Sequence, residues 1–438
     1  MKLNGSQIVL EVLKEQGVDT IFGYPGGTIL NIFDELYKYG DTFKHILTAH
    51  EQGASHAADG YARATGKVGV CFATSGPGAT NLVTGIATAY MDSVPVVAIT
   101  CNYATSGLGR DSFQEVDICG ITMPITKHNF QIKSVEELAD TIRRAFSIAQ
   151  SGRKGPVLID IPKDITSAEC EYTPMPKVEV EKAKEPKKSA VERAVELIRN
   201  AKKPLIYVGG GAILSNVGED LVTFAEKIDA PVASSLMGLG AFPYDNPLHL
   251  GLIGMHGHYE CNKAAHDCDV LITCGARFSD RVAGNRKKFA PNAEILHIDI
   301  DSAEMDKNIV SNYHLRGDLA EVLPILTREI EQLDHSEWRK EIETFRRPFK
   351  QLQIGDYVNP QTLIEKIDAA TPDDTIVVTD VGQHQLWAAQ FYKFKHSRTL
   401  LTSGASALWV IQWVRQWAVK WVALTKQLLC LQVTAASI

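Results

Sequence analysis

The sequence predicts an α/β protein built on parallel sheets and divided into successive domains. Short apolar runs alternate with helical stretches, Gly-rich turns follow several of the runs, and polar stretches separate the runs into groups. Strand, Gly-rich turn, helix and strand in this order are typical of a parallel sheet covered by helices. A chain of 438 residues is also long enough for two or three domains.

The first group of runs predicts a domain over residues 1–170. An amphipathic helix begins near Ser6. Buried strands are expected at 67–74, 94–100 and 156–161, and the first of them breaks at Ser75-Gly-Pro-Gly before a helix from Ala79. Residues 171–189 are rich in proline, lysine and glutamate, which predicts a solvated linker.

The second group predicts a central domain over residues 190–330. Its apolar runs lead into Gly209-Gly-Gly, Gly275 and Asp299. A glycine turn after a strand lets the backbone approach a phosphate, and an acid at a strand end can accept a hydrogen bond from a ribose hydroxyl. The spacing of a dinucleotide fingerprint is not clean here, so tight-turn glycines and a nucleotide site both remain open.

The last part of the sequence changes character twice. A second polar linker is expected over 331–360, followed by the start of a third domain over 361–404, whose strand runs into Asp380-Val-Gly-Gln-His. Residues 405–438 form a different tail. It holds tryptophans at 409, 413, 417 and 421, a spacing that would align them on one side of a helix.

Composition narrows the classes of function. The net charge of −7 argues against a nucleic-acid partner. Eight scattered cysteines without a C-x-x-C pair favour reduced thiols over a disulfide framework or a zinc site, and no metal ligands are assigned. No apolar run approaches the length of a membrane span and no signal peptide pattern opens the chain, so we expect a cytoplasmic protein without a membrane partner.

Two charged residues draw no attention by themselves. Glu51 follows a histidine and Lys163 stands at a predicted strand end, and either fits an ordinary surface position. Their surroundings belong, however, to a series of motifs in a fixed order. These motifs are Phe22-Gly-Tyr-Pro-Gly-Gly, His50-Glu-Gln-Gly-Ala, Gly60-Tyr-Ala-Arg-Ala-Thr-Gly, Ala73-Thr-Ser-Gly-Pro-Gly-Ala-Thr-Asn, Ser112-Phe-Gln-Glu-Val-Asp, Asp160-Ile-Pro-Lys-Asp, Leu236-Met-Gly-Leu-Gly-Ala-Phe-Pro, Gly254-Met-His-Gly, Ala276-Arg-Phe-Ser-Asp-Arg-Val and His297-Ile-Asp-Ile-Asp.

Over about residues 1–404 the chain closely resembles the catalytic large subunits of acetolactate synthase. The resemblance implies a thiamine-diphosphate-binding fold with a pyrimidine domain, a central Rossmann-like FAD domain and a diphosphate domain that is only begun. It implies the cofactors thiamine diphosphate, Mg²⁺ and FAD. The implied reaction condenses two pyruvates, or pyruvate and 2-oxobutanoate, with release of CO₂ in the biosynthesis of valine, leucine and isoleucine. A homodimer or tetramer and a small regulatory subunit are implied as partners.

The resemblance also assigns roles to individual residues. Glu51 corresponds to the catalytic glutamate at the aminopyrimidine ring, where a carboxyl group favours the imino tautomer. The residues matching the thiamine diphosphate site are Tyr24, Pro25, Glu51, Pro77, Asn81, Gln114, Gly382, Gln383 and His384, and those matching the substrate site are Phe113, Gln114 and Lys163. The residues matching the FAD site are Arg153, Gly209, Gly210, Gly211, Leu236, Met237, Met255, His256, Gly257, Arg277, Asp280, Arg281, Asp299 and Asp318.

The tail departs from the family pattern after Gly404. The family continues with a domain in which Gly-Asp-Gly and a following Asn hold Mg²⁺ and the diphosphate, and this sequence contains no Gly-Asp-Gly. We interpret residues 405–438 as a frameshifted, truncated end. Leu431-Gln-Val-Thr-Ala-Ala can be encoded so that a shifted frame reads Ala-Gly-Asp-Gly-Ser. The alternative, without a frameshift, is a genuine C-terminal amphipathic helix.

Three functional hypotheses follow. The first is acetolactate synthase activity. The second is a catalytically inactive truncated product that retains FAD binding, favoured by the missing Gly-Asp-Gly. The third is an FAD-dependent enzyme resembling pyruvate oxidase, against which the Arg277-Phe-Ser-Asp-Arg and Phe113-Gln-Glu segments argue. Ser279 replaces an aspartate commonly found in the family at that point, a mild departure.

Overall fold

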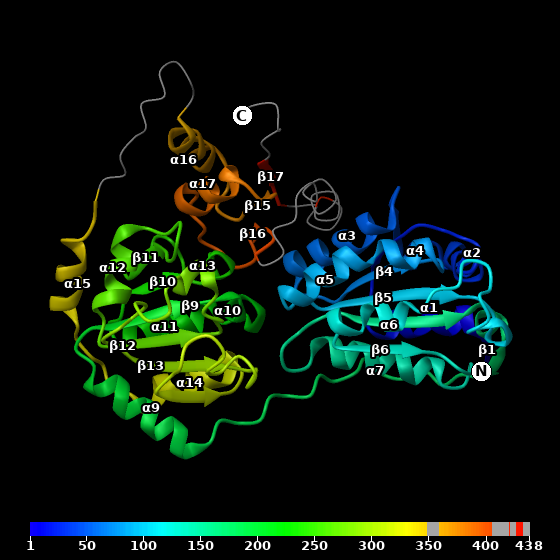
Figure 1. Ribbon diagram of the computed structural model, residues 1–438, viewed down its shortest axis with the longest axis horizontal. Coiled ribbons are helices and arrows are strands. Elements are labelled where there is room, and N and C mark those ends of the chain that lie inside the picture. Colours follow the sequence, from blue (N-terminus) through cyan, green and yellow to red (C-terminus); the bar gives the residue numbers. More distant parts are fainter. Residues whose placement is uncertain (348–358, 405–419, 421–425, 432–438) are drawn as a thin grey trace. The chain divides into compact units, whose positions relative to one another are not determined.

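The structure is a computed structural model that describes residues 1–347, 359–404, 420 and 426–431. It divides into two compact units, which among the described residues span Met1–Lys182 and Ala183–Gly404, the second with strand β17. Figure 1 shows both units, coloured along the sequence. The tryptophans expected to align at 409, 413, 417 and 421 lie outside the described residues, as does most of the tail.

The N-terminal unit is a parallel sheet with helices on both faces (Figure 1). Its six strands lie in the order β3-β2-β4-β5-β7-β6, and every neighbouring pair is parallel. The strands are β2 (Thr20–Gly23), β3 (Lys44–Leu47), β4 (Gly69–Ala73), β5 (Val96–Asn102), β6 (His128–Gln131) and β7 (Val157–Pro162), and a separate antiparallel pair joins β1 (Lys2–Asn4) to β8 (Glu169–Glu171).

Helices of the N-terminal unit cover its sheet with two separate cores. Alternate strand residues face opposite sides, so Val70 and Phe72 pack with α1, α2 and α7, whereas Cys71 and Ala73 pack with α3 and α5. The helices are α1 (Gly5–Glu15), α2 (Leu30–Lys38), α3 (Glu51–Thr65), α4 (Pro77–Asn81), α5 (Val83–Met91), α6 (Ile118–Thr122), α7 (Leu138–Gln150) and α8 (Lys163–Ser167), with 3₁₀ turns η1 (Gly40–Thr42), η2 (Thr105–Gly107) and η3 (Met123–Ile125).

The second unit contains a central parallel sheet in the order β11-β10-β9-β12-β13-β14. Read by position along the chain this is 3-2-1-4-5-6, the order of doubly wound nucleotide-binding sheets. The strands are β9 (Pro204–Val208), β10 (Val232–Ser234), β11 (His249–Leu252), β12 (Val270–Cys274), β13 (Glu294–Asp299) and β14 (Tyr313–Arg316). The helices are α9 (Lys188–Asn200), α10 (Gly210–Ser215), α11 (Gly218–Lys227), α12 (Tyr259–Asp267), α13 (Asp280–Ala283), α14 (Leu319–Glu329) and α15 (Ser336–Glu343), with the 3₁₀ turn η4 (Leu236–Gly238).

The two polar stretches differ in structure. Residues 172–187 are all described and contain neither helix nor strand. The stretch 331–360, by contrast, contains α15, whose Trp338 is only 2% exposed and donates its indole N–H to the carbonyl oxygen of Pro204 at 3.0 Å. The first half of this stretch therefore packs on the central domain as an ordered helix, although its composition is polar.

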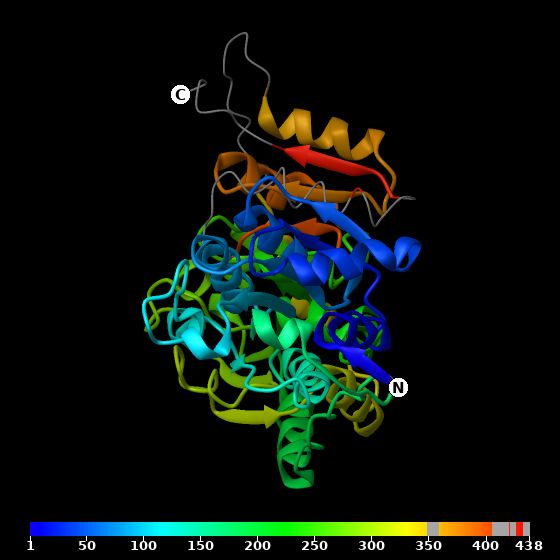
Figure 2. The same cartoon turned by 90° about the vertical axis from the view of Figure 1, so that its right-hand side faces the viewer.

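A small third sheet completes the second unit. Strand β15 (Ile376–Thr379) lies between β16 (Leu400–Leu401) and β17 (Leu428–Leu431), all parallel, with helices α16 (Pro360–Ala370) and α17 (Gln383–Phe391) beside them. Figure 2 shows β17, drawn in red, next to these elements. Residues 428–431 of the tail therefore take part in a sheet, which the sequence analysis did not anticipate.

Candidate active site

The carboxyl ends of the N-terminal strands form the edge at which the expected pyrimidine-site residues gather. Strand order reverses between β2 and β4, so the loops that follow these strands diverge there and leave a crevice. Tyr24 and Pro25 follow β2, and Pro77 follows β4. Backbone approach is close at this point, because a Cβ on Gly26 would lie 2.5 Å from Thr74 Cβ.

Thr28 ties three strand ends together at the crevice. Its hydroxyl donates to the carbonyl oxygen of Cys101 at 3.1 Å, lies 2.9 Å from Thr74 Oγ1 and accepts the N–H of Ser75 at 3.1 Å. The Ser75 hydroxyl is buried and has no hydrogen-bond partner among the described residues. Since a buried hydroxyl is normally satisfied, this atom marks a place for a polar group of a ligand or a water molecule.

Glu51 is the first residue of helix α3, beyond the end of β3. It is 8% exposed, and its Oε2 accepts a hydrogen bond from Asn81 Nδ2 at 2.9 Å. A Cβ on Gly78 would lie 3.1 Å from the other oxygen, Oε1, so glycine at this position leaves room beside that oxygen. The structure thus joins Glu51 and Asn81, which are 30 residues apart in the chain, and keeps one carboxylate oxygen accessible from α4.

Two of the residues expected at the substrate approach the same edge from other loops. Lys163 begins α8 after β7, and its ammonium group donates to the carbonyl oxygen of Gly27 at 3.0 Å. Gln114 lies against the turn that precedes Pro77, since a Cβ on Gly76 would lie 2.8 Å from the Gln114 carbonyl oxygen. Phe113 is 80% exposed. The crevice loops therefore carry an acid, an amide, a lysine and an exposed aromatic ring.

The glycines of the central domain meet each other at the second strand reversal, between β9 and β12. The N–H of Gly209 donates to the Cys274 carbonyl oxygen and that of Gly211 to the Gly275 carbonyl oxygen, both at 3.0 Å. A Cβ on Gly211 would lie 2.7 Å from Gly275 Cα, and Gly275 has a φ of +60°. At least part of the glycine signal thus reflects contact between two strand-end turns.

The other central residues expected at an FAD site follow the carboxyl ends of the same sheet. Met255 and Arg281 are joined directly: the Met255 N–H donates to the Arg281 carbonyl oxygen at 2.7 Å. The remaining positions are Leu236 and Met237 in η4, His256 and Gly257 after β11, Arg277 after β12, Asp280 in α13, Asp299 at the end of β13 and Asp318 after β14.

Three of the residues expected at an FAD site also form local hydrogen bonds. The Asp299 carboxylate accepts the N–H of Asp301 at 2.8 Å, and that of Asp318 accepts the N–H of Ala320 at 3.0 Å as the N-cap of α14. Arg153 belongs to the N-terminal unit, where it precedes β7 and donates to Ser93 Oγ at 2.9 Å. Arg153 thus belongs to a different unit from the other residues expected at an FAD site.

The residues expected near the diphosphate lie at the carboxyl end of β15. Gly382 and Gln383 open α17, and a Cβ on Gly382 would lie 3.0 Å from the His384 ring. Both ring nitrogens of His384 and the Ser403 hydroxyl are buried without a hydrogen-bond partner among the described residues. Burial lowers the pKa of His384, which favours its neutral form.

Comparison with known proteins agrees with this arrangement. Residues 3–121 match the family described as "Thiamine pyrophosphate enzyme, N-terminal TPP binding domain", and residues 191–326 match "Thiamine pyrophosphate enzyme, central domain". The chain is 46% identical over 421 residues to the "Probable acetolactate synthase large subunit" of Methanocaldococcus jannaschii, an alignment covering 92% of this chain and 71% of that protein. The chain belongs to the acetolactate synthase large-subunit family.

Further relatives give the same result. The acetolactate synthase large subunit of Corynebacterium glutamicum is 45% identical over 414 residues, with 92% of this chain and 66% of that protein covered. The acetolactate synthase isozyme 2 large subunit of Escherichia coli is 45% identical over 403 residues, with 92% and 72% covered. The chain thus spans about two thirds to three quarters of the length of these large subunits.

Three residues of this acetolactate synthase family site were not identified from the sequence. Thr28, Ser75 and Glu115 all lie within or beside the motifs, but their partners are distant or in the backbone. No spacing pattern predicts such contacts. The available signal was their place in or beside the motifs, which carries no geometry.

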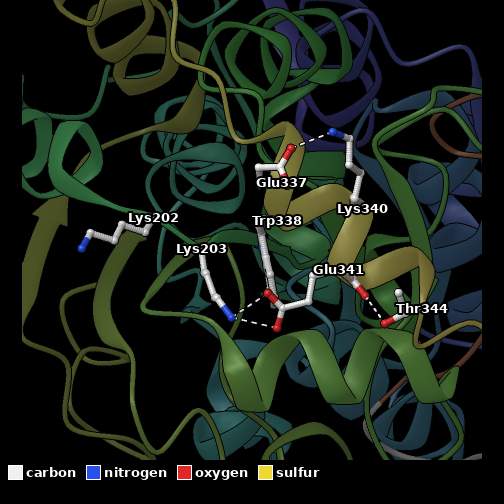
Figure 3. A pocket seen from close by; sticks show the side chains of 7 residues that line it. All are labelled: Lys202, Lys203, Glu337, Trp338, Lys340, Glu341 and Thr344. Carbon is white, nitrogen blue, oxygen red and sulfur yellow. Dashed lines mark hydrogen bonds and ion pairs between the residues drawn. The ribbon is translucent and has the colours of Figure 1, made fainter.

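A hollow of about 440 Å³ on the central domain lies elsewhere, beside the amino end of β9. Figure 3 shows its charged groups paired with one another, as where Lys203 meets Glu341 at 2.7 Å, while Lys202 points away from the other side chains. Its lining residues are Lys202, Lys203, Glu337, Trp338, Lys340, Glu341 and Thr344. Paired surface lysines do not form an active site, so this hollow is set aside.

Two searches concern other kinds of site. In the described ranges, no group of three or more His, Cys, Asp or Glu side chains is placed to hold a metal ion. No helix in the described part of the chain is both long and apolar enough to cross a membrane. The eight cysteines are free thiols.

Proposed function

We propose that this chain supplies the pyrimidine-binding and flavin-binding parts of an acetolactate synthase. The reaction condenses two pyruvates, or pyruvate and 2-oxobutanoate, and releases CO₂ in the biosynthesis of branched-chain amino acids. The observation that carries the proposal is the buried Glu51 carboxylate, held by Asn81 at 2.9 Å and facing the gap left by Gly78. Membership of the large-subunit family supplies the reaction class.

The residues at the crevice fit an aminopyrimidine ring. A carboxylate with one oxygen engaged by Asn81 and one beside Gly78 can hold or release a proton at a ring nitrogen. The partnerless Ser75 hydroxyl adds a second polar contact. Thiamine diphosphate, when bound, supplies a carbon nucleophile and an electron sink for decarboxylation of a 2-oxo acid.

The chain's own residues would divide the work as follows. Glu51 holds or transfers the proton, Asn81 orients Glu51, and Tyr24, Pro25 and Pro77 shape the pyrimidine end of the crevice. Lys163 offers a positive charge for the carboxylate of pyruvate. Phe113 and Gln114 flank the substrate and exclude water.

Fewer residues of this chain are available for the diphosphate and the metal than for the pyrimidine ring. His384, Gly382 and Gln383 provide polar groups at the end of β15 for the diphosphate. Among the described residues, no group of three or more His, Cys, Asp or Glu side chains is placed to hold a metal ion. No step of the reaction is therefore derived through the metal.

FAD binding is proposed at the carboxyl edge of the central sheet. The 3-2-1-4-5-6 strand order, the glycine turn after β9 and the guanidinium groups of Arg277 and Arg281 suit a phosphate-bearing nucleotide. The domains proposed are 1–170, 190–330 and the start of a third at 361–404. A cytoplasmic homodimer or tetramer is proposed, and the name "large subunit" of its relatives suggests a small regulatory partner.

The alternative to the synthase is a flavin-binding chain without turnover. An assay of the purified chain with pyruvate, thiamine diphosphate, Mg²⁺ and FAD distinguishes the two. Acetolactate formation supports the synthase, whereas bound yellow flavin without product supports the second candidate. When inorganic phosphate and O₂ are also supplied, acetyl phosphate as product would instead indicate a pyruvate oxidase.

Glu51→Gln tests the role of the carboxylate within that assay. We expect kcat/KM for pyruvate to fall by about 10²-fold or more, the usual effect of losing a general acid–base group, with bound flavin unchanged. Glu171→Gln, at an exposed glutamate of the same unit, should leave kcat/KM unchanged. Equal activity of Glu51→Gln and the unchanged chain would remove Glu51 from the mechanism.

A further inference from the structure

The loop between β5 and α6 has an unusual backbone for a segment that carries substrate-site residues. Gly109, Asp111 and Gln114 have φ values of +74°, +55° and +56°. Left-handed conformations are unfavourable for residues with a side chain and persist where neighbouring contacts enforce them. Something in the surroundings must therefore hold Asp111 and Gln114 in place.

Glu115 supplies the main contacts inside this loop. One carboxylate oxygen accepts the N–H of Gly109, and the other accepts the N–H of Ser112 at 3.0 Å. The Ser112 hydroxyl donates to the Gly107 carbonyl oxygen at 2.7 Å. Hydrogen bonds from the backbone, that of Gly109 first, lower the pKa of Glu115, so the carboxylate is ionised at neutral pH.

The ends of the loop are attached to the domain by side chains of strand β5 and helix α8. Asn102 Nδ2 donates to the buried Asp160 carboxylate at 2.8 Å and to the Val116 carbonyl oxygen at 3.3 Å. Asp164 accepts from Thr105 through its N–H at 3.0 Å and its hydroxyl at 2.5 Å. The loop is thus fixed at both ends, and Glu115 determines the shape of the part between them.

That shape brings Gln114 against the turn at the crevice. A Cβ on Gly76 would lie 2.8 Å from the Gln114 carbonyl oxygen and 3.1 Å from Gln114 Cβ. Glycine at position 76 thus leaves the space that Gln114 occupies, and a shift of the loop away from this turn is opposed by the Glu115 hydrogen bonds. The position of Gln114 relative to Pro77 therefore depends on the Glu115 carboxylate.

We propose that Glu115 is a positioning residue for the carboligation site: its carboxylate fixes the loop over residues 107–115 and so places Phe113 and Gln114 beside the Gly76–Pro77 turn. Glu115 acts through the backbone of its own loop and needs no contact with substrate. The inference rests on the proposed function, because that function gives Phe113 and Gln114 their role at the substrate.

Glu115→Gln is the direct test, with the full chain and its cofactors. The amide keeps the size of the side chain but has only one acceptor oxygen, whereas the N–H groups of Gly109 and Ser112 each need an acceptor. One hydrogen bond is therefore lost, and the amide NH₂ faces a backbone N–H, so that two donors meet. Asp111→Asn is the matched control. It removes one negative charge from the same loop, at a carboxylate that forms no hydrogen bond or ion pair with the described residues.

Peptide-resolved hydrogen exchange is the first measurement. We expect amide exchange within 103–117 to rise about tenfold in Glu115→Gln, the consequence of losing charge-assisted hydrogen bonds, while β5 and β7 stay unchanged. Amide exchange in Asp111→Asn should stay near that of the unchanged chain. Equal exchange in Glu115→Gln and the unchanged chain would overturn the proposal.

The second measurement is the acetolactate assay, divided into KM and kcat. A misplaced Gln114 should raise the KM for pyruvate about tenfold while kcat changes less, a division that a general loss of folded protein does not produce. Faster loop exchange with an unchanged KM and kcat would overturn the positioning role. If the unchanged chain makes no acetolactate, the proposed function fails, and the exchange comparison still decides whether Glu115 holds the loop.

Discussion

At the scale of single residues, the crevice depends on glycines as much as on the carboxylate they surround. Gly78 has Thr74 on one side and Glu51 on the other, so even a methyl group would occupy the space beside Glu51 Oε1. Gly27, in the loop opposite, has open space where its Cβ would stand. Alanine at position 78 would therefore fill the space beside Glu51, whereas alanine at position 27 would only restrict the backbone.

We expect Gly78→Ala to lower the affinity for thiamine diphosphate about tenfold. Its Cβ would lie 2.7 Å from Thr74 Cγ2 and 3.1 Å from Glu51 Oε1, and overpacking of this kind typically costs about 1–3 kcal/mol. Isothermal titration with thiamine diphosphate and Mg²⁺ measures the change, and Gly27→Ala should bind as the unchanged chain does. Equal affinities for both variants would mean that the ring does not approach Glu51 past Gly78.

The sequence identified some of these residues and could not identify others. Glu51, Lys163 and the two substrate-side residues were named only because their motifs resemble a family, since nothing local distinguishes Glu51 from a surface glutamate. Thr28 acts through partners 46 to 73 positions away, and such contacts appear only once the strands are placed side by side. Their hydrogen bonds leave no periodic pattern in the chain.

At the scale of elements, the strands were easier to predict than their order. The apolar runs at 67–74, 94–100 and 156–161 are β4, β5 and β7 to within two residues at each end. A buried parallel strand reads as a continuous apolar run, which explains this agreement. Strand order depends on tertiary packing and so cannot be predicted from composition. The helix within 331–360 likewise depends on the packing of Trp338 against the central domain.

Helix α3 shows how one element is held in register with its neighbours. Arg63 Nε donates to Asp59 at 2.9 Å, and its Nη2 donates to Asp92, at the end of α5, also at 2.9 Å. The carboxylates of Asp59 and Asp92 have no exposed surface. This buried triad joins α3 to α5 at the end opposite Glu51, so it anchors the helix that presents the Glu51 carboxylate.

Arg63→Met should destabilise the N-terminal unit strongly. The substitution keeps an unbranched stem but leaves two buried carboxylates without a counter-charge, which typically costs about 3–5 kcal/mol. Lys67→Met is the control, because Lys67 pairs with Asp19 at 2.5 Å on the surface, where ion pairs contribute about 0–1 kcal/mol.

Calorimetric unfolding of the N-terminal unit measures both variants. A loss below about 1 kcal/mol for Arg63→Met would show that the two aspartates take up protons or water at little cost, against the buried-triad interpretation. A loss for Lys67→Met as large as that for Arg63→Met would also contradict it. The expected order is a large effect for Arg63 and a small one for Lys67.

At the scale of the whole molecule, each unit carries its own cores and its own candidate ligand edge. The clusters on the two faces of the N-terminal sheet and those on the central sheet share no residues, and the fully described stretch 172–187 between the units contains no helix or strand. Such an arrangement allows the units to unfold separately, so stability is best assigned unit by unit.

The acid sensitivity of the second unit can be predicted from one histidine. The pKa of His249, on β11, is lowered to about 4, first by burial and then by the charges of His258 and Arg346. In the unfolded chain a histidine has a pKa of about 6.5. Between these two values the unfolded chain binds a proton that the folded chain does not, so the free energy of unfolding falls as pH drops from about 6.5 to about 4.

His249→Gln should remove most of this pH dependence, because glutamine cannot be protonated in this range. The full difference of pKa corresponds to about 3 kcal/mol at most, which sets an upper limit on the stability that the unchanged chain loses through His249. Calorimetric unfolding of the second unit at pH 7 and pH 4.5 measures the loss of unfolding free energy. His266→Gln, at an exposed histidine on α12, is the control and should lose as much of this free energy as the unchanged chain. If His249→Gln loses just as much, the acid sensitivity comes from other groups, of which the neighbouring His258, whose pKa burial also lowers, is the first to substitute next.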